Sequence, residues 1–228
     1  MLLTLSDDIW LADGPVTDVA GFRYPTRMAI IRLGNGGLFV WSPIALSEPL
    51  RLAVDALGEV RHLVAPNALH HLFLGEWQHA YPAAKLYAAP GLRRRRTDLN
   101  FDTDLGDMPD AAWDGELDQV QVANRIATET VFFHRASRTV LFTDLIQHFR
   151  PGWFTGWRAL IARLDLMTAS EPQVPRKFRL AVVDRRAARE SLTRILAWPA
   201  EKVVMAHTDT VHQNGRAFIA RAFRWLLK

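Results

Sequence analysis

The chain has 228 residues, of which 49% are hydrophobic and 23% charged, and a formal net charge of +4 at pH 7. This ordinary composition predicts one globular domain over residues 1–228, because no linker, repeat or low-complexity tract divides the chain. The absence of cysteine excludes disulfides and thiolate chemistry, fits a cytoplasmic protein, and leaves nitrogen and oxygen atoms to bind any metal. Neither an apolar stretch long enough to span a bilayer nor a signal-peptide pattern is present, so we expect no membrane partner.

The N-terminal part of the chain is predicted to form strands. Residues 1–12 alternate weakly between apolar and polar side chains, as in an edge strand or hairpin. Two apolar runs, Met28–Leu33 and Gly37–Ser42, flank a Gly-Asn-Gly sequence, which is typical of a β-hairpin.

Helices and strands then alternate. The periodicity predicts a helix from its N-cap Ser47 to Leu57, a strand at Val60–Val64, a helix at Ala68–Tyr81 and a strand at Lys85–Ala89. This order favours a parallel or mixed sheet covered by helices.

The rest of the chain is mixed in pattern. Residues 91–116 are polar and irregular, which predicts a long surface segment, and the aromatic-rich residues 149–157 suit an interface or a lid. Four further strands are predicted, at Val120–Ala123, Thr130–Phe133, Thr139–Thr143 and Lys202–Ala206. Three further helices are predicted: one that ends at Met167, one from Asp184 to Ala197, and one from Gly215 to the end of the chain.

A run of four arginines, Arg93–Arg96, lies in the irregular segment. Such a run favours a small anionic substrate, although its simplest interpretation is a solvated loop or the start of a helix. Aromatic residues do not interleave with it, so we do not expect a nucleic-acid partner.

Three histidines and one aspartate follow predicted strands. His70, His71, Asp144 and His207 each lie just beyond a strand's carboxyl end, where open α/β folds bind ligands. Two or three imidazoles with one carboxylate suit one divalent ion such as Zn²⁺, Fe²⁺ or Mn²⁺. An ion with one open position lowers the pKa of a bound water molecule to about 7.

These positions also have structural interpretations. Asp144 could be the N-cap of a segment that begins at Leu145, and His207 could hydrogen-bond a loop carbonyl. The chain has no GxSxG elbow and no glycine-rich phosphate loop, so nothing supports a serine nucleophile or a nucleotide site.

The other histidines and the tryptophans are interpreted as structural. His134 lies in a predicted hairpin loop, where it would contact Arg135 or Ser137. His62 lies within a strand and His79 on a helix face, so both are expected to pack or to face solvent. The tryptophans expected in the core are Trp77, Trp113, Trp153 and Trp157.

Three runs that carry the candidate ligands resemble motifs of the metallo-β-lactamase superfamily. Residues 66–71 resemble the position of its HxHxDH motif, VLFTDLI at 140–146 its strand before the bridging aspartate, and VVMAHTD at 203–209 its last histidine. The resemblance implies an α/β fold, a metallo-β-lactamase-like αββα sandwich of two mixed sheets flanked by helices. Other features resemble the uncharacterised DUF4336 family within that superfamily: Trp77, Tyr81-Pro82 and the HRASRT run at 134–139.

The match to the HxHxDH motif is incomplete. Its first two histidines fall on Pro66 and Ala68, which have no ligating side chain, its aspartate falls on His70 and its last histidine on His71. The third histidine of the family's first metal site would fall within residues 123–128, which contain none.

The second metal site is better preserved. Asp144 matches the bridging aspartate and His207 the last histidine, while Glu129, the acid nearest the missing third histidine, is expected close to Asp144 through hairpin pairing. The superfamily's early-strand aspartate is absent, and the equivalent run is FVWSP at 39–43. The resemblance therefore implies one metal held by the four candidates, or none.

Two functions remain open at this point. The first is a metal-dependent hydrolase with one metal ion, acting on an ester, thioester, amide or phosphoester. The second is a non-catalytic, metal-free binding or scaffold protein that retains the fold, because fold alone does not determine function.

Overall fold

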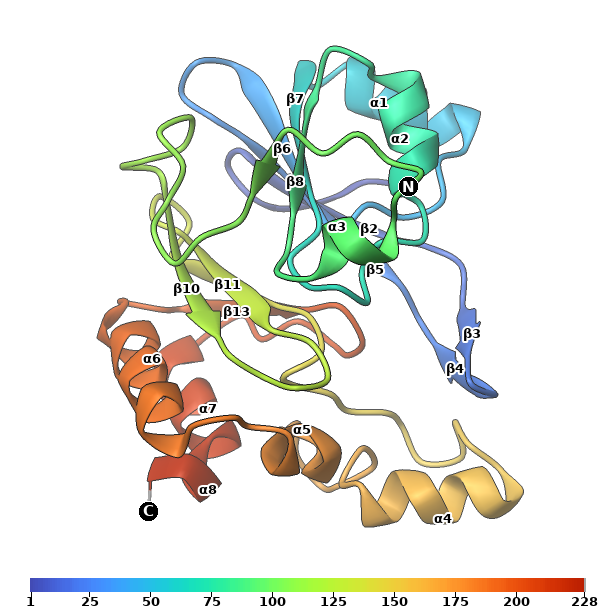
Figure 1. Cartoon of the computed structure of the whole chain (residues 1–228), viewed down its shortest axis with the longest axis vertical. Coiled ribbons are helices and arrows are strands. Elements are labelled where there is room, and N and C mark those ends of the chain that lie inside the picture. The colour runs from blue at the N-terminus through green and yellow to red at the C-terminus, as the bar shows by residue number, and fades with distance from the viewer. Residues whose placement is uncertain (228) are drawn as a thin grey trace.

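The computed structural model describes residues 1–227 and contains two large β-sheets packed face to face (Figure 1). Helices cover the outer face of each sheet, so the layers run helix, sheet, sheet, helix. The αββα sandwich of two mixed sheets that the sequence implies is confirmed.

The sheets differ in size. The first has the strand order β1-β2-β5-β6-β7-β8-β9 and the second β10-β11-β12-β13, and β3 and β4 form a separate hairpin. The strands of the first sheet are β1 (Leu3–Ser6), β2 (Ile9–Asp13), β5 (Arg27–Arg32), β6 (Gly37–Trp41), β7 (Glu59–Val64), β8 (Lys85–Ala88) and β9 (Thr103–Asp104). The others are β3 (Thr17–Val19), β4 (Phe22–Tyr24), β10 (Leu117–Val122), β11 (Glu129–His134), β12 (Thr139–Phe142) and β13 (Lys202–Met205).

Helices α1, α2 and α3 cover the first sheet, and α6, α7 and α8 cover the second (Figure 1). Their bounds are α1 (Glu48–Asp55), α2 (Leu74–Ala80), α3 (Leu92–Arg95), α4 (Gly156–Leu164), α5 (Arg176–Leu180), α6 (Arg185–Ala197), α7 (Gly215–Ala222) and α8 (Arg224–Leu227). None of the helices in residues 1–227 is long and apolar enough to cross a bilayer.

An apolar layer joins the two sheets. Ile31 and Phe39 from the first sheet and Phe132 and Val204 from the second are fully buried in it, and the Phe39 and Phe132 rings lie 5.3 Å apart. Full burial of such a side chain stabilises the fold by roughly 1.5–3 kcal/mol, so this layer holds the sheets in a fixed relative position.

The outward faces of the sheets are apolar too. Leu38 and Val40 of β6 pack with Trp77 of α2, while Phe142 of β12 packs with Phe223, 5.8 Å between ring centroids. Both sheets therefore have two buried faces, which explains why their central strands read as continuous apolar runs.

Most predicted elements form where the sequence places them. The hairpin of β5 and β6 is present, and the caps at Ser47 and Asp184 are confirmed, since each side chain accepts a backbone N–H, from Leu50 (3.4 Å) and Arg186 (2.7 Å). The helix expected from residue 68 is shorter, however, and begins only at Leu74.

A side chain causes that difference. The amide oxygen of Asn67 accepts the backbone N–H groups of Leu69 (2.8 Å) and His70 (3.2 Å), so residues 68–73 form turns instead of the first helical turns. An asparagine that satisfies local backbone donors in this way competes with the helix.

Other predictions need correction. The C-terminal helix breaks between α7 and α8, and the segment 91–116 contains the short elements α3 and β9. Trp77 and Trp113 are fully buried as predicted, but Trp153 and Trp157 are exposed, because the segment that carries them lies outside the helix–sheet layers.

His62 on β7 gives the fold a pH dependence. The ring is buried, with Nδ1 3.2 Å from the Tyr87 hydroxyl, and burial lowers its pKa to about 4. Between pH 6.5 and 4 the unfolded chain therefore binds a proton here that the folded chain does not, so the stability contributed by neutral His62 is lost as the pH falls.

We expect His62→Gln to remove this contribution. The free energy of unfolding of the wild type should fall by up to about 3 kcal/mol from this group between pH 7 and pH 4, and the variant should show a correspondingly shallower fall. Urea unfolding at a series of pH values measures both slopes. His79→Gln, at an exposed histidine of α2, is the matched control; parallel wild-type and His62→Gln profiles would contradict the assignment.

Candidate metal centre

The candidate ligands meet at one edge of the sandwich. Two parallel strand pairs, β6–β7 in the first sheet and β12–β13 in the second, end at this edge. His70 follows β7, Asp144 follows β12 and His207 follows β13. Because Phe142 pairs with Met205 in the parallel register, the residues two positions further on, Asp144 and His207, come side by side.

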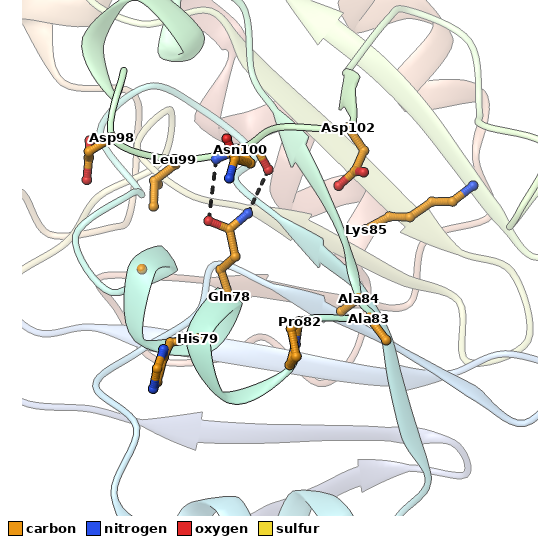
Figure 2. A pocket seen from close by; sticks show the side chains of 11 residues that line it. Gln78, His79, Pro82, Ala83, Ala84, Lys85, Asp98, Leu99, Asn100 and Asp102 are labelled. Carbon is orange, nitrogen blue, oxygen red and sulfur yellow. Dashed lines mark hydrogen bonds between the residues drawn. The ribbon is translucent and has the colours of Figure 1, made fainter.

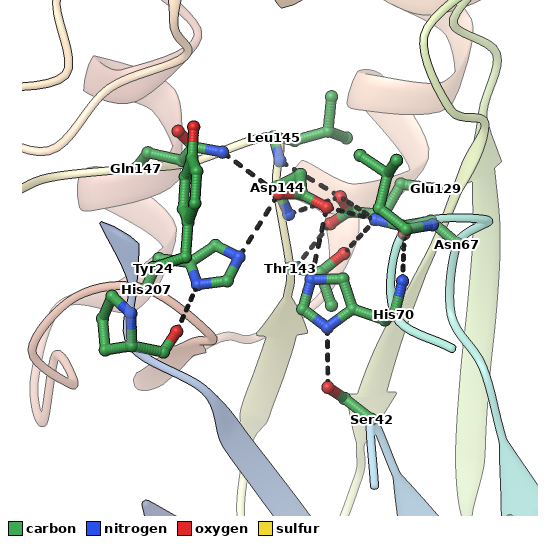
Figure 3. A network of polar contacts seen from close by, with 12 residues as sticks. Tyr24, Ser42, Asn67, His70, Glu129, Thr143, Asp144, Leu145, Gln147 and His207 are labelled. Atoms are coloured by element: carbon green, nitrogen blue, oxygen red, sulfur yellow. Dashed lines mark hydrogen bonds and ion pairs between the residues drawn. The ribbon is translucent and has the colours of Figure 1, made fainter. Parts of the chain in front are cut away.

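His70, Asp144 and His207 form one compact group. The His70 Nε2 atom lies 3.2 Å from Asp144 Oδ2, and the His207 Nε2 atom lies 3.3 Å from Asp144 Oδ1 (Figure 3). The possible ligand atoms of the three residues all lie within 4.8 Å of one another. Asp144 thus presents one carboxylate oxygen to each imidazole.

The hydrogen bonds of His207 show that a proton or a metal ion must lie between its Nε2 atom and Asp144. Its Nδ1 lies 2.7 Å from the carbonyl oxygen of Pro25, which can only accept, so Nδ1 carries a proton. Its Nε2 faces the carboxylate of Asp144, which also only accepts when ionised. A second proton on the ring, or a metal ion bound by both atoms, must therefore lie between Nε2 and the carboxylate.

Ser42 orients His70. The Ser42 hydroxyl lies 2.7 Å from His70 Nδ1, and burial lowers the pKa of His70, so the neutral ring accepts from Ser42 and donates from Nε2 to Asp144. Ser42 has a φ of +52°, a left-handed conformation that costs a non-glycine residue of order 1 kcal/mol. This residue belongs to the FVWSP run that stands where the resembled superfamily has its early aspartate.

Two buried residues hold Asp144 in place. Asn67 donates to Asp144 Oδ2 (2.7 Å) and to the Thr143 hydroxyl (2.8 Å), which ties the His70 turn to the end of β12. Glu129 accepts the backbone N–H groups of Thr143, Asp144 and Leu145 at 2.7, 2.8 and 3.0 Å. The closeness of Glu129 to Asp144 expected from the hairpin is therefore confirmed.

These two carboxylates have opposite pKa shifts. Burial, together with the charge of Asp144, raises the pKa of Glu129 to about 7. Burial would also raise the pKa of Asp144, but His70 and His207 hold it well below its usual range. Asp144 is thus the ionised carboxylate that faces the two imidazoles, and it does not cap a helix at Leu145, because residues 145–148 are not helical.

The structure does not bring His71 into the group. Arg96 Nη1 lies 3.1 Å from His71 Nδ1 and 2.7 Å from its carbonyl oxygen. Burial, with Arg95 and Arg96, lowers the pKa of His71 to about 4, so the ring is neutral. Since Arg96 can only donate, Nδ1 of His71 accepts and the ring proton stays on Nε2. The Ser42 hydroxyl beside His70 can also accept, so the proton of that ring can move to Nδ1 and free Nε2 for an ion.

The group of His70, Asp144 and His207 lies in the wall of a pocket of about 520 Å³. The pocket walls include Leu69, Phe73 and Phe178, and two cationic side chains, Arg95 and Lys177, reach it. Although burial would lower the pKa of Lys177, Tyr24 and Asp165 raise it, so the ammonium group stays charged. Of the arginines 93–96, Arg95 is the one that lines this pocket.

Gln147 also lines the same pocket. Its Nε2 donates to Asp144 Oδ1 over 3.1 Å, which points its Oε1 away from that carboxylate. This oxygen is buried, and no donor among residues 1–227 reaches it. Gln147 therefore orients Asp144 from the pocket wall, while its own side-chain oxygen lies below the surface of the pocket.

A second hollow, of about 610 Å³, lies beside α2 and the loop of residues 98–102 (Figure 2). Gln78 bridges it by donating to the Asn100 carbonyl oxygen (2.6 Å) and accepting the Asn100 N–H (3.4 Å). It contains none of the candidate metal ligands, so we place the functional site in the pocket of His70, Asp144 and His207.

Sequence reasoning missed three supporting residues of this site. Ser42, Asn67 and Gln147 are polar side chains that are buried around the candidate ligands. A signal existed for Asn67, since a polar residue followed a buried strand. His134 contacts the Ser137 hydroxyl as expected, with Nδ1 at 2.8 Å, but it is the last residue of β11 and pairs with Thr139, so it does not lie in the hairpin loop where the sequence placed it.

Comparisons with known proteins agree with the fold. Residues 6–93 match the family described as Domain of unknown function (DUF4336), a range that contains His70 and His71. A metallo-β-lactamase from Pontibacter korlensis is 12% identical, with a TM-score of 0.65, and the alignment covers 100% of this chain and 99% of that one. None of the curated proteins matches the sequence.

Two other solved structures are similar. The metallo-β-lactamase FIM-1 from Pseudomonas aeruginosa, in a mono-zinc form, is 12% identical with a TM-score of 0.62, and the alignment covers 100% of this chain and 96% of that one. A metal-soaked flavodiiron core, Flv1 from Synechocystis sp. PCC6803, is 11% identical with a TM-score of 0.67, and the alignment covers 100% of this chain and 60% of that one. At these identities the similarity concerns the fold.

Asn67→Ala tests whether the buried amide organises the site. The substitution removes the amide N–H that Asp144 Oδ2 and the Thr143 hydroxyl accept, and the amide oxygen that accepts the N–H groups of Leu69 and His70. We therefore expect the free energy of unfolding to fall by about 2–4 kcal/mol. Urea unfolding measures the loss. Asn100→Ala, at an exposed asparagine, should change stability by less than about 0.5 kcal/mol; equal effects of the two substitutions would mean that Asn67 has no organising role.

Proposed function

Since the chain has the metallo-β-lactamase fold and matches the DUF4336 family over residues 6–93, we propose that it is a metal-dependent hydrolase with one metal ion, held by His70, Asp144 and His207. The observation that carries the proposal is the contact between His207 Nε2 and Asp144 Oδ1, where two acceptors face each other unless a cation joins them.

The donor set fits a divalent ion. Two imidazole nitrogens and one carboxylate leave open coordination positions and are used in proteins for both Zn²⁺ and Fe²⁺. With an ion on both Nε2 atoms, His70 would carry its ring proton on Nδ1 and donate it to the Ser42 hydroxyl, as His207 donates from Nδ1 to the Pro25 carbonyl oxygen. Both ring orientations would then be fixed as partners of metal-binding histidines fix them. His71 is left out of the proposed site because Arg96 engages it.

The same residues support one ion and not two. Pro66 and Ala68 stand where the family motif has its first two histidines, and neither has a ligating atom. Within residues 1–227, the group of His70, Asp144 and His207 is the one set of three that could hold an ion.

The pocket suggests how a substrate would be held. A bound divalent ion supplies Lewis acidity, which polarises a carbonyl or phosphoryl oxygen and lowers the pKa of a bound water molecule. Lys177 and Arg95 would bind an anionic group of the substrate, and the apolar wall would exclude water. Gln147 would hold the Asp144 carboxylate in place beside the substrate.

These features favour a small anionic ester, thioester, amide or phosphoester.

One observation favours the alternative, a metal-free binding or scaffold protein. A proton on each Nε2 atom, with His207 as an imidazolium, satisfies Asp144 without any ion. Metal content separates the two functions.

We expect about one equivalent of metal in the purified protein after incubation with Zn²⁺, Fe²⁺ or Mn²⁺ and dialysis, measured by elemental analysis. His207→Ala and Asp144→Asn should lose it, because each removes one of three ligands. His71→Ala should keep it and serves as the matched control. The absence of metal from the wild type would support the metal-free function, and two equivalents would contradict the single site.

The loaded protein should hydrolyse a member of a panel of carboxylate-bearing esters, thioesters and phosphodiesters. Lys177→Ala should raise KM for an anionic substrate about tenfold and leave KM for its neutral analogue nearly unchanged, because one charge-assisted contact is lost. Lys85→Ala, an exposed lysine outside the pocket, is the control. Equal effects on both substrates would show that Lys177 does not select charge.

A further inference from the structure

Helix α4 leaves its large apolar side chains exposed, although Trp157 also meets Phe22 edge-on, with 5.8 Å between ring centroids. Ala162 is the buried residue of this helix and packs with Phe149, Phe154 and Met167. The large apolar side chains of α4, at spacings of three and four residues, lie on another face and are exposed. They are Trp157 (56%), Leu160 (60%), Ile161 (43%) and Leu164 (56%).

The face continues onto the neighbouring helix. Leu180 at the end of α5 is 84% exposed and lines a groove of about 440 Å³ together with Ile161 and Leu164. We call these five residues, Trp157, Leu160, Ile161, Leu164 and Leu180, the apolar face. A surface helix normally turns such a stripe toward the core, so a contiguous apolar face indicates a partner.

The charges around the apolar face select the kind of partner. Residues 150–186 contain eight basic residues (Lys and Arg) and three acidic ones (Asp and Glu). The remainder of the chain contains twenty basic and twenty-one acidic residues. The net positive charge of the protein is therefore concentrated in the segment that carries the apolar face.

Two of these arginines are free to bind anions. Arg163 on α4 and Arg176 on α5 are exposed, and Arg176 lines the groove with Ile161 and Leu164. Within residues 1–227 neither forms an ion pair with a carboxylate, in contrast to the lysine next to Arg176, which pairs with Asp165.

We propose that the apolar face is a docking site for the surface of a bilayer that contains anionic lipids. Trp157 and the leucines would enter the boundary between headgroups and acyl chains, and Arg163 and Arg176 would contact lipid phosphates, as in interfacial amphipathic helices. Because no helix of residues 1–227 can span a bilayer, the contact is with the surface. A second copy of the chain fits less well, since two positively charged faces would repel each other.

The groove lies beside the pocket of His70, Asp144 and His207. Tyr24 and Lys177 line both hollows, so the bilayer surface would lie next to the pocket mouth. The docking site does not depend on a bound metal or on hydrolysis, and its test uses neither.

Co-sedimentation with vesicles tests the proposal. The full chain should bind phosphatidylcholine vesicles that contain phosphatidylglycerol at least about tenfold more tightly than pure phosphatidylcholine vesicles, and added salt should weaken the binding. The double variant Leu160→Gln/Leu164→Gln should bind the anionic vesicles at least about tenfold more weakly, because two exposed leucines no longer enter the bilayer.

The charge contribution has its own variant. Arg163→Gln/Arg176→Gln should lose about tenfold in binding to anionic vesicles and keep its binding to neutral ones. The controls are Leu52→Gln, at a leucine on α1 that is 59% exposed, and Arg221→Gln, at an exposed arginine on α7. All substituted side chains are exposed, and circular dichroism confirms folding.

Two results would overturn the proposal. The first is wild-type binding that is undetectable or indifferent to lipid charge. The second is a dimer in sedimentation velocity that Leu160→Gln/Leu164→Gln converts to monomer, which would assign the apolar face to contact between copies of the chain.

Discussion

Glu129 holds three successive backbone N–H groups at the end of β12, and the geometry of the site depends on this interaction. A buried carboxylate is costly unless donors surround it, and here the donors are the backbone of Thr143, Asp144 and Leu145. The interaction fixes the backbone of Asp144, so its side chain can accept from Asn67 and Gln147 and face two imidazoles at once. Without it, the segment after β12 would have to satisfy three buried N–H groups elsewhere.

The two sheets contribute unequally to the site. The second sheet supplies Asp144 and His207 through the parallel pairing of β12 with β13, which sets their side-by-side position through backbone hydrogen bonds. The first sheet supplies His70 through a turn held by Asn67, and Ser42 from the end of β6. The group of His70, Asp144 and His207 therefore forms only when the apolar layer packs the two sheets together, so substitutions that weaken this layer would also disturb the site.

Much of this arrangement could be predicted from the sequence. The apolar runs that became β6, β7, β12 and β13 place His70, Asp144 and His207 at strand ends, and motif spacing relates them to one fold. The separation of His70 from His71 could not be predicted, because it depends on Arg96, twenty-five residues away in the chain, which engages one ring and not the other.

Tertiary contacts also explain the errors. The start of α2 was displaced by the side chain of Asn67, a local competitor whose effect depends on what its amide meets. Trp153 and Trp157 were expected in the core because large aromatic side chains are usually buried, but both are exposed. Trp157 lies on α4, and Trp153 lies in the loop before it. Periodicity shows that a helix has an apolar side and does not show which way that side points.

The bond from His207 to the Pro25 carbonyl connects the site to a part of the molecule outside both sheets. Pro25 follows the β3–β4 hairpin, and Val19 and Ala20 of that hairpin line the pocket. A ligand that shifts the hairpin would therefore rotate the imidazole through this bond and change how well His207 can bind an ion. By thermodynamic reciprocity, an ion that orders the imidazole would also order the hairpin, so occupancy of the pocket and occupancy of the metal centre would be linked equilibria.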